Sequence, residues 1–104
     1  MRFQTEFNYM LKIRVGQGLS PDPKEGEIYD FEKTIERIYP LNTPMYLIDD
    51  DYKVYGKCVI LEYSVGHGIT KGKYKLFELY DSKTSQLLTE DVLRSFTYLK
   101  TLTQ

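Results

Sequence analysis

The chain has 104 residues, with 15 acidic and 14 basic side chains, one His, one Cys and no Trp. This length predicts a single domain, and one cysteine excludes an internal disulfide framework or a multi-cysteine zinc site. A net charge of −1 argues against the uniformly basic surface of a dedicated DNA-binding protein. The first residues form no hydrophobic secretory segment, and the longest aliphatic run is only Val59-Ile60-Leu61. We therefore expect a soluble, cytoplasmic protein without membrane spans, metals or cofactors.

The N-terminal part alternates polar and apolar side chains. Phe3, Phe7, Leu11 and Val15 are among the apolar residues that occupy odd positions between residues 2 and 15. This period of two predicts a strand with one buried face. Because the stretch is long for one strand, we expect it to bend or to be shared between two sheet layers.

A loop follows at residues 16–26, where two prolines and three glycines oppose regular structure. Gly16 and Gly18 follow the predicted strand as in a dinucleotide-binding fingerprint. The third glycine of that fingerprint is missing, and Pro21 forbids the helix that would hold a pyrophosphate. We therefore reject the dinucleotide interpretation.

Residues 27–39 have two interpretations. Ile28, Phe31, Ile35 and Ile38 fit a helical stripe, but the apolar residues are mainly β-branched or aromatic, which favours a strand. We expect a strand that becomes irregular near residues 33–34.

Turn and strand signals then alternate. Turns are predicted at residues 40–44, 49–51 and 66–72, and strands at residues 45–48, 52–65 and 73–80. We expect a bend or bulge at Gly56. Thr89 resembles a helix N-cap, and an apolar face at helical spacing follows it as far as Leu102. The pattern predicts a mainly β (α+β) fold, a small antiparallel β-barrel or rolled sheet of about five to six strands with one C-terminal helix.

Four short segments carry a resemblance to a known family. They are Tyr29-Asp30-Phe31, Ile38-Tyr39-Pro40, the stretch from Tyr55 to Ile60 (Tyr-Gly-Lys-Cys-Val-Ile), and Leu87-Leu88-Thr89. Together they resemble a family of small uncharacterised proteins, a domain of unknown function, from Bacillus-type bacteria. More loosely, the strand order and the Gly-Lys-x-Val-Ile strand are similar to PUA-like barrels, some of which bind RNA. Neither resemblance assigns a site residue to this chain.

Catalytic and metal-binding interpretations find little support in the residue pattern. Cys58 and His67 could form a nucleophile–base pair, but a Cys inside an apolar strand usually behaves as a small hydrophobe with a raised pKa. Asp49-Asp50-Asp51 could offer oxygen ligands to Mg²⁺ or Ca²⁺, but a solvated turn fits the run better. The glycine-rich segment 66–72 could hold an anion beside its lysines, or could be a plain hairpin connection.

Charge and tyrosine content indicate a binding surface. Six acidic and two basic residues lie between positions 22 and 36, whereas five lysines and one glutamate lie between positions 53 and 75. Tyrosines are interleaved with these lysines and could stack on bases if exposed. Ten tyrosines are too many to bury in so small a core, so we expect an exposed aromatic patch. The candidate ligand-binding residues are His67, Lys71, Lys73, Lys75, Lys57, Tyr63 and Tyr74.

Three functional hypotheses follow. The first is a non-catalytic binding or interaction module, with a protein partner or a second copy of the chain on the tyrosine-rich surface. The second is a PUA-like domain that binds RNA weakly. The third is a small enzyme acting on a nucleotide or phosphorylated substrate through His67, Lys71 and Lys73. Glu62 or Glu78 would serve as its base.

Overall fold

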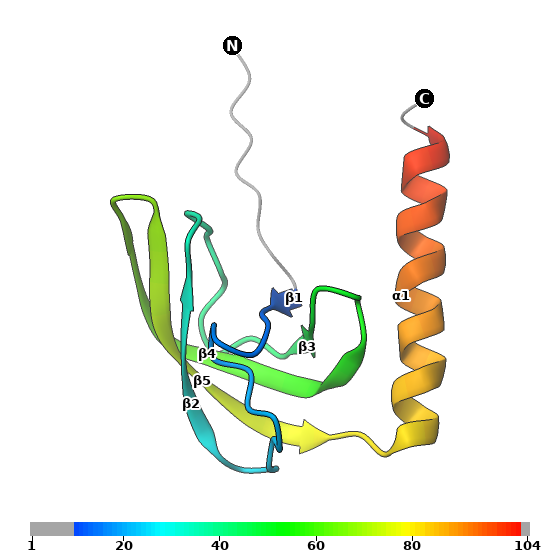
Figure 1. Ribbon diagram of the computed structural model, residues 1–104, viewed down its shortest axis with the longest axis horizontal. Coiled ribbons are helices and arrows are strands. Elements are labelled where there is room, and N and C mark those ends of the chain that lie inside the picture. The colour runs from blue at the N-terminus through cyan, green and yellow to red at the C-terminus, as the bar shows by residue number, and fades with distance from the viewer. Residues whose placement is uncertain (1–9, 103–104) are drawn as a thin grey trace.

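The computed structural model describes residues 10–102, and within the C-terminal helix the side chains up to Ser95 and that of Thr97. The described elements are, in chain order, β1 (Met10–Lys12), β2 (Ile28–Lys33), β3 (Met45–Ile48), β4 (Val54–Gly66), β5 (Ile69–Leu79) and α1 (Ser82–Leu102). The strands form one mixed sheet in the order β1-β3-β4-β5-β2, and α1 stands beside it (Figure 1). β1 pairs with β3 in parallel, and the other pairs are antiparallel.

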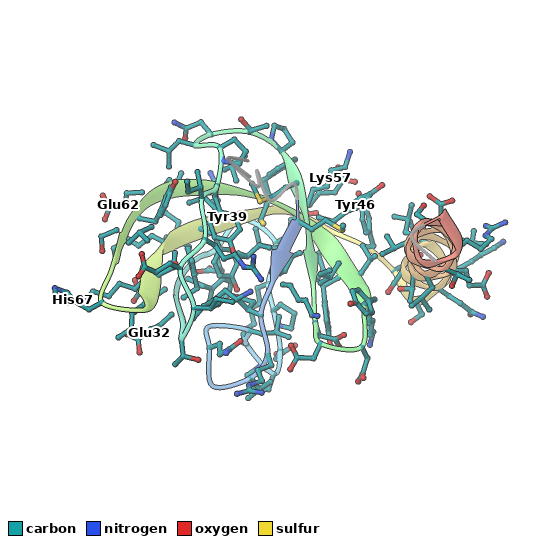
Figure 2. The ribbon with its side chains drawn as sticks, turned by 90° about the horizontal axis from the view of Figure 1, so that it is seen from above. Glu32, Tyr39, Tyr46, Lys57, Glu62 and His67 are labelled. Carbon is teal, nitrogen blue, oxygen red and sulfur yellow. The ribbon has the colours of Figure 1, made fainter. Side chains whose placement is uncertain are left out.

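The described fold confirms the mainly β class. The sheet is mixed, however, rather than antiparallel as predicted. The sheet is curved but not closed into a barrel, because β1 and β2 are edge strands that do not pair with each other (Figure 2). A side chain links these two edges instead, since Lys33 Nζ donates a hydrogen bond to the Lys12 carbonyl oxygen at 2.6 Å. Of the segment 27–39, residues 28–33 form a strand, which confirms the strand interpretation for that part, and the strand ends at Lys33, where we expected it to become irregular. Of the long N-terminal strand only Met10–Lys12 can be compared with the prediction, because residues 2–9 lie outside the described residues.

The predicted loop at residues 66–72 is wrong. β4 and β5 continue to Gly66 and from Ile69, and only His67 and Gly68 connect them. Both have positive φ, at 55° and 77°, which is the backbone of a type I′ turn. This turn matches the twist of paired strands, so the glycine-rich segment forms a tight hairpin rather than an open cradle for an anion.

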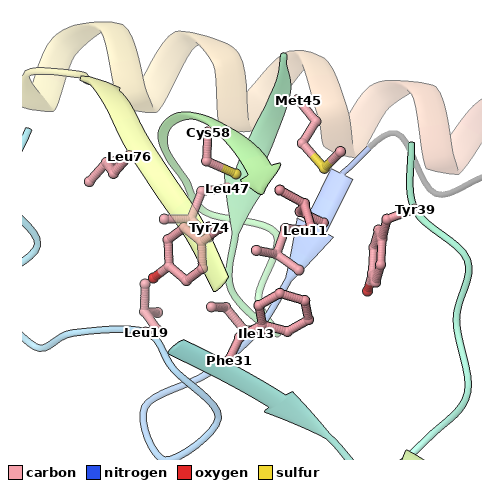
Figure 3. Packing of buried hydrophobic residues seen from close by; sticks show 11 residues of the cluster. Leu11, Ile13, Leu19, Phe31, Tyr39, Met45, Leu47, Cys58, Tyr74 and Leu76 are labelled. Atoms are coloured by element: carbon pink, nitrogen blue, oxygen red, sulfur yellow. The ribbon is translucent and has the colours of Figure 1, made fainter. Parts of the chain in front are cut away.

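The inner face of the curved sheet holds the main core (Figure 3). Tyr74 and Ile60 lie opposite each other on β5 and β4 and are fully buried. The strands at both ends of the sheet contribute to the same core. Its buried members are Leu11, Ile13, Leu19, Phe31, Tyr39, Met45, Leu47, Cys58, Ile60, Tyr74 and Leu76.

A second, smaller core lies between the sheet and α1. Ile48 and Val54 pack there against Val92 of the helix. The helix is also attached by hydrogen bonds, since Ser85 Oγ donates to the Val54 carbonyl oxygen and the Val54 amide donates to Thr89 Oγ1. This contact uses the first half of α1, which fixes the helix against the start of β4.

The helix begins earlier than the sequence pattern predicts. Asp81 Oδ1 accepts a hydrogen bond from the Thr84 amide at 2.7 Å, so Asp81 is the N-cap. This bond lowers the pKa of Asp81. Thr89, the predicted N-cap, lies inside the helix, where its hydroxyl donates to the Ser85 carbonyl oxygen. None of the described helical residues forms a segment long and apolar enough to span a membrane.

Candidate functional site

The outer face of β2, β5 and β4 carries two charged rows set by strand register. One row places Lys73 of β5 between Asp30 of β2 and Glu62 of β4. The next row places Lys71 between Glu32 and Ser64. The acidic segment and the lysine-rich segment, which are separate in the sequence, therefore alternate side by side across the sheet.

An irregularity in β4 decides which side chains reach this face. The register between β4 and β5 shifts between Ile60 and Glu62. Cys58 and Ile60 point into the inner core before the shift, and Tyr63 packs against that core after it. The extra residue, Leu61, thereby moves Glu62 to the outer face, although Cys58, Ile60 and Glu62 are spaced by two, a spacing that keeps residues of a regular strand on one face.

Two glycines allow backbones to approach closely at this place. A Cβ on Gly72 would collide with the Glu62 carbonyl oxygen and with Tyr63, and a Cβ on Gly18 would collide with the Asp30 carbonyl oxygen. Gly18 also has φ of +120°, a conformation that favours glycine. The loop of residues 16–18 is held against the edge of β2 because the Glu32 amide donates to the Gln17 carbonyl oxygen at 2.9 Å.

The loop and the two charged rows enclose an open cleft of about 700 Å³. This volume lies within the range of small-molecule sites, roughly 300–1,000 Å³. Charged side chains of both signs and three glycines line it. The lining residues are Gly16, Gln17, Gly18, Asp30, Phe31, Glu32, Glu62, Tyr63, Ser64, Lys71, Gly72 and Lys73.

Only some of the charged side chains in the cleft form ion pairs with one another. Lys73 Nζ and Asp30 Oδ1 are 2.9 Å apart. The hydrogen bond and charge of Asp30 raise the pKa of Lys73, and the charge of Glu62 raises it further. Glu32, Glu62 and Lys71 form no ion pair with any side chain that the structure describes. These three charged groups remain available to a ligand.

The structure brings together three of the seven predicted ligand-binding residues. Lys71, Lys73 and Tyr63 line the cleft. Lys75 lies two residues along β5, opposite Val59 and Ile28 and outside the cleft, and Lys57 lies farther along β4, opposite Glu78. Figure 2 shows His67 at the tip of the hairpin, beyond Glu32 and Glu62, where it is exposed and outside the cleft.

The prediction that Tyr74 stacks on a ligand is wrong. Its side chain is fully buried, and its hydroxyl donates to the Gly18 carbonyl oxygen at 2.8 Å. Its ring packs against Tyr29 and Phe31 with centroids 5.6 and 6.2 Å away. The residue supports the cleft from beneath by fixing the loop at Gly18.

The expected exposed tyrosine patch is also absent from the described part of the chain. Of the eight tyrosines with described burial, two are buried and six are half-buried. Several use their hydroxyl groups internally. For example, Tyr55 donates to Asp49 Oδ2, and Tyr63 accepts a hydrogen bond from the Tyr39 amide. Half-burial with an internal hydrogen bond satisfies both ends of the side chain, so a tyrosine surplus does not require an exposed patch.

The other candidate groups, Cys58 and the run Asp49-Asp50-Asp51, contribute to the fold. Cys58 is fully buried, and burial raises the pKa of its thiol to about 12, as the sequence predicts for a core cysteine. Asp49 Oδ1 accepts hydrogen bonds from the amides of Asp51 and Lys53, which forms the predicted turn. No group of three metal-ligating side chains occurs among the residues described here.

Sequence reasoning missed Asp30, Glu32 and the glycine loop as parts of the same site. Asp30 and Glu32 are spaced by two, as are Lys71 and Lys73, and the two pairs carry opposite charges. This match is the one feature of the sequence that could have indicated that the two segments pair as neighbouring strands. The charge match alone does not identify the partner strand or the register, and no feature of the sequence predicts the bulge at Leu61.

A comparison with solved structures finds one protein of similar fold. The chain is similar to the crystal structure of protein YtmB from Bacillus subtilis, with a TM-score of 0.59 and 27% sequence identity over 79% of this chain and 98% of that chain. No family model matches the chain, and no curated protein matches it. The likeness agrees with the predicted resemblance to small proteins of Bacillus-type bacteria. The PUA-like resemblance is not shown.

Proposed function

We propose that the protein is a non-catalytic binding module whose ligand occupies the cleft between residues 16–18 and the outer face of β2, β5 and β4. The observation that carries this proposal is the cleft itself, about 700 Å³ in volume and lined by unpaired charges. Its edges are held by backbone contacts at two glycines, which makes the site largely pre-formed.

Binding fits the arrangement of reactive groups better than catalysis does. The catalytic hypothesis placed His67, Lys71 and Lys73 around the substrate, with Glu62 or Glu78 as the base. His67 lies at the hairpin tip, outside the residues that line the cleft, and Cys58 is buried in the inner core. Neither His67 nor Cys58 therefore reaches a ligand in the cleft. Glu62, a candidate base, does line the cleft beside Lys71 and Lys73. Without the histidine or a nucleophile near them, these three groups fit the binding of a ligand better than its chemical conversion.

RNA binding is the less favoured alternative. Lys71 and Lys73 alternate with Asp30, Glu32 and Glu62 across the sheet, which weakens the attraction of this surface for phosphates. Base stacking would also need an exposed aromatic ring, whereas Tyr63 is half-buried.

A fragment screen by ¹⁵N–¹H NMR tests the proposal. The screen uses neutral, cationic and anionic fragments, and we expect some of them to shift the amide signals of residues 16–18, 30–32, 62–64 and 71–73. The variant Lys71→Trp should fill the cleft and abolish these shifts. Lys75→Trp is the matched control, because it removes a lysine from the same face of β5 outside the cleft.

In the control the shifts should persist. A screen in which no fragment perturbs the cleft amides contradicts the proposal. Shifts that survive unchanged in Lys71→Trp contradict it equally.

A further inference from the structure

The charged residues that line the cleft favour a ligand of positive charge. Three carboxylates, of Asp30, Glu32 and Glu62, stand against the two ammonium groups of Lys71 and Lys73. Asp30 and Lys73 neutralise each other at 2.9 Å. The remaining charged groups are two carboxylates and one ammonium, so the cleft carries an uncompensated negative charge.

This sign is the reverse of what the lysine-rich segment indicates when its sequence is considered alone. Antiparallel pairing brings Asp30 opposite Lys73 and Glu32 opposite Lys71. The register shift at Leu61 adds Glu62 on the other side of Lys73. A cation entering the cleft therefore meets carboxylates from both flanking strands, whereas an anion meets only one unpaired lysine.

We propose that the ligand of this cleft is a small organic cation that presents a guanidinium or ammonium group to Glu62, while Glu32, in the neighbouring row on the other side of β5, adds to the negative charge of the cleft. This inference rests on the proposed function of the cleft. A guanidinium group is planar, carries five N–H donors and binds carboxylates through paired hydrogen bonds. Lys71 lies opposite Glu32 and Ser64, where it can bind a carbonyl group of the same ligand.

Isothermal titration calorimetry with two ligands of matched shape tests the sign of the charge. Nα-acetyl-arginine amide carries one positive charge, and Nα-acetyl-citrulline amide replaces the guanidinium group with a neutral urea. Both are titrated at the same ionic strength. We expect saturable binding of the arginine derivative and at least about tenfold weaker binding of the citrulline derivative, the loss of one charged hydrogen-bonding group.

Two glutamate variants locate the binding. Glu62→Gln keeps the shape of the side chain and removes its charge, so the affinity for the arginine derivative should fall about tenfold. Glu78→Gln is the control, because Glu78 is an exposed carboxylate on β5 outside the cleft. Its affinity should match that of the unaltered protein.

The inference is overturned by equal binding of the two derivatives, by unchanged affinity in Glu62→Gln, or by no binding of the arginine derivative. Its failure is distinct from failure of the proposed function. Neutral or anionic fragments that perturb the cleft amides would preserve a binding module while removing the cationic ligand.

Discussion

The two faces of the β4–β5 pair differ sharply over a few residues. On the inner face, Ile60 and Tyr74 lie opposite each other, fully buried in an aromatic core. On the outer face, one step along the same strands, Glu62 and Lys73 lie opposite each other at the cleft. A single extra residue in β4, Leu61, therefore places a charged surface next to a closed core without interrupting the hairpin.

Breaking the close contact between β4 and β5 at Gly72 should destabilise the protein most. Gly72→Ala places a Cβ against the Glu62 carbonyl oxygen and the backbone of Tyr63, neither of which can move without separating β5 from β4. We expect the variant to lose cooperative folding, as measured by thermal unfolding. Gly66→Ala is the matched control in the same hairpin, because no atom lies within 4 Å of its added Cβ. Similar melting curves for the two variants would refute the close approach at Gly72.

Truncating adjacent residues of β4 compares the two faces directly. Ile60 is fully buried, so Ile60→Ala should lower the free energy of unfolding by about 2–5 kcal/mol. Val59 is half-buried on the outer face, and Val59→Ala should cost about 1 kcal/mol. Urea denaturation measures both values. Equal losses would mean that the inner core and the outer face are not separate environments.

Alkaline pH should weaken the inner core through Cys58. Burial raises the pKa of the thiol from 9.0 to about 12, so above about pH 9 the unfolded chain releases a proton that the folded chain retains. Stability is then lost as pH rises, by up to about 1.4 kcal/mol per pH unit for this group. Between pH 9 and 10 the unfolding free energy of Cys58→Ala should fall less steeply with pH than that of the unaltered protein. Parallel slopes in urea titrations would remove Cys58 as the cause.

The smallest effect should come from the exposed ion pair on the outer face. Asp30→Asn removes the charge opposite Lys73, but half of the Lys73 side chain and most of the Asp30 side chain are exposed. Water and salt screen such pairs, so thermal unfolding should show no measurable change in stability. A large loss would show that the charged rows hold the strands together rather than line a ligand site.

The residue pattern predicts the strands well because their faces have opposite polarity. The segment 28–33 is a strand because β-branched and aromatic side chains outweigh its helical stripe, and Cys58 is buried because its neighbours are aliphatic. The helix start was missed because Asp81 lies before a polar first turn, where no apolar periodicity marks the beginning.

The candidate site was harder to predict because it depends on pairing between distant segments. Lys71 and Lys73 were recognised as ligand-binding candidates, but their neighbours Glu32 and Asp30 lie about 40 residues earlier in the chain. The charge of a sheet surface is the sum over paired strands, and the register fixes that sum. The local count of lysines is therefore positive, whereas the lining of the cleft has three carboxylates against two lysines.

In the proposed binding site, strand pairing converts a lysine-rich segment into a cleft that binds cations. The most direct measurement is an NMR titration of one ¹⁵N-labelled sample, first with Nα-acetyl-arginine amide and then, on a fresh portion at the same low salt, with a short single-stranded RNA. We expect the arginine derivative to shift the amide signals of Glu62, Lys71 and Gly72 and the RNA to leave them unchanged. Shifts of these signals by the RNA, with none from the arginine derivative, would contradict this expectation.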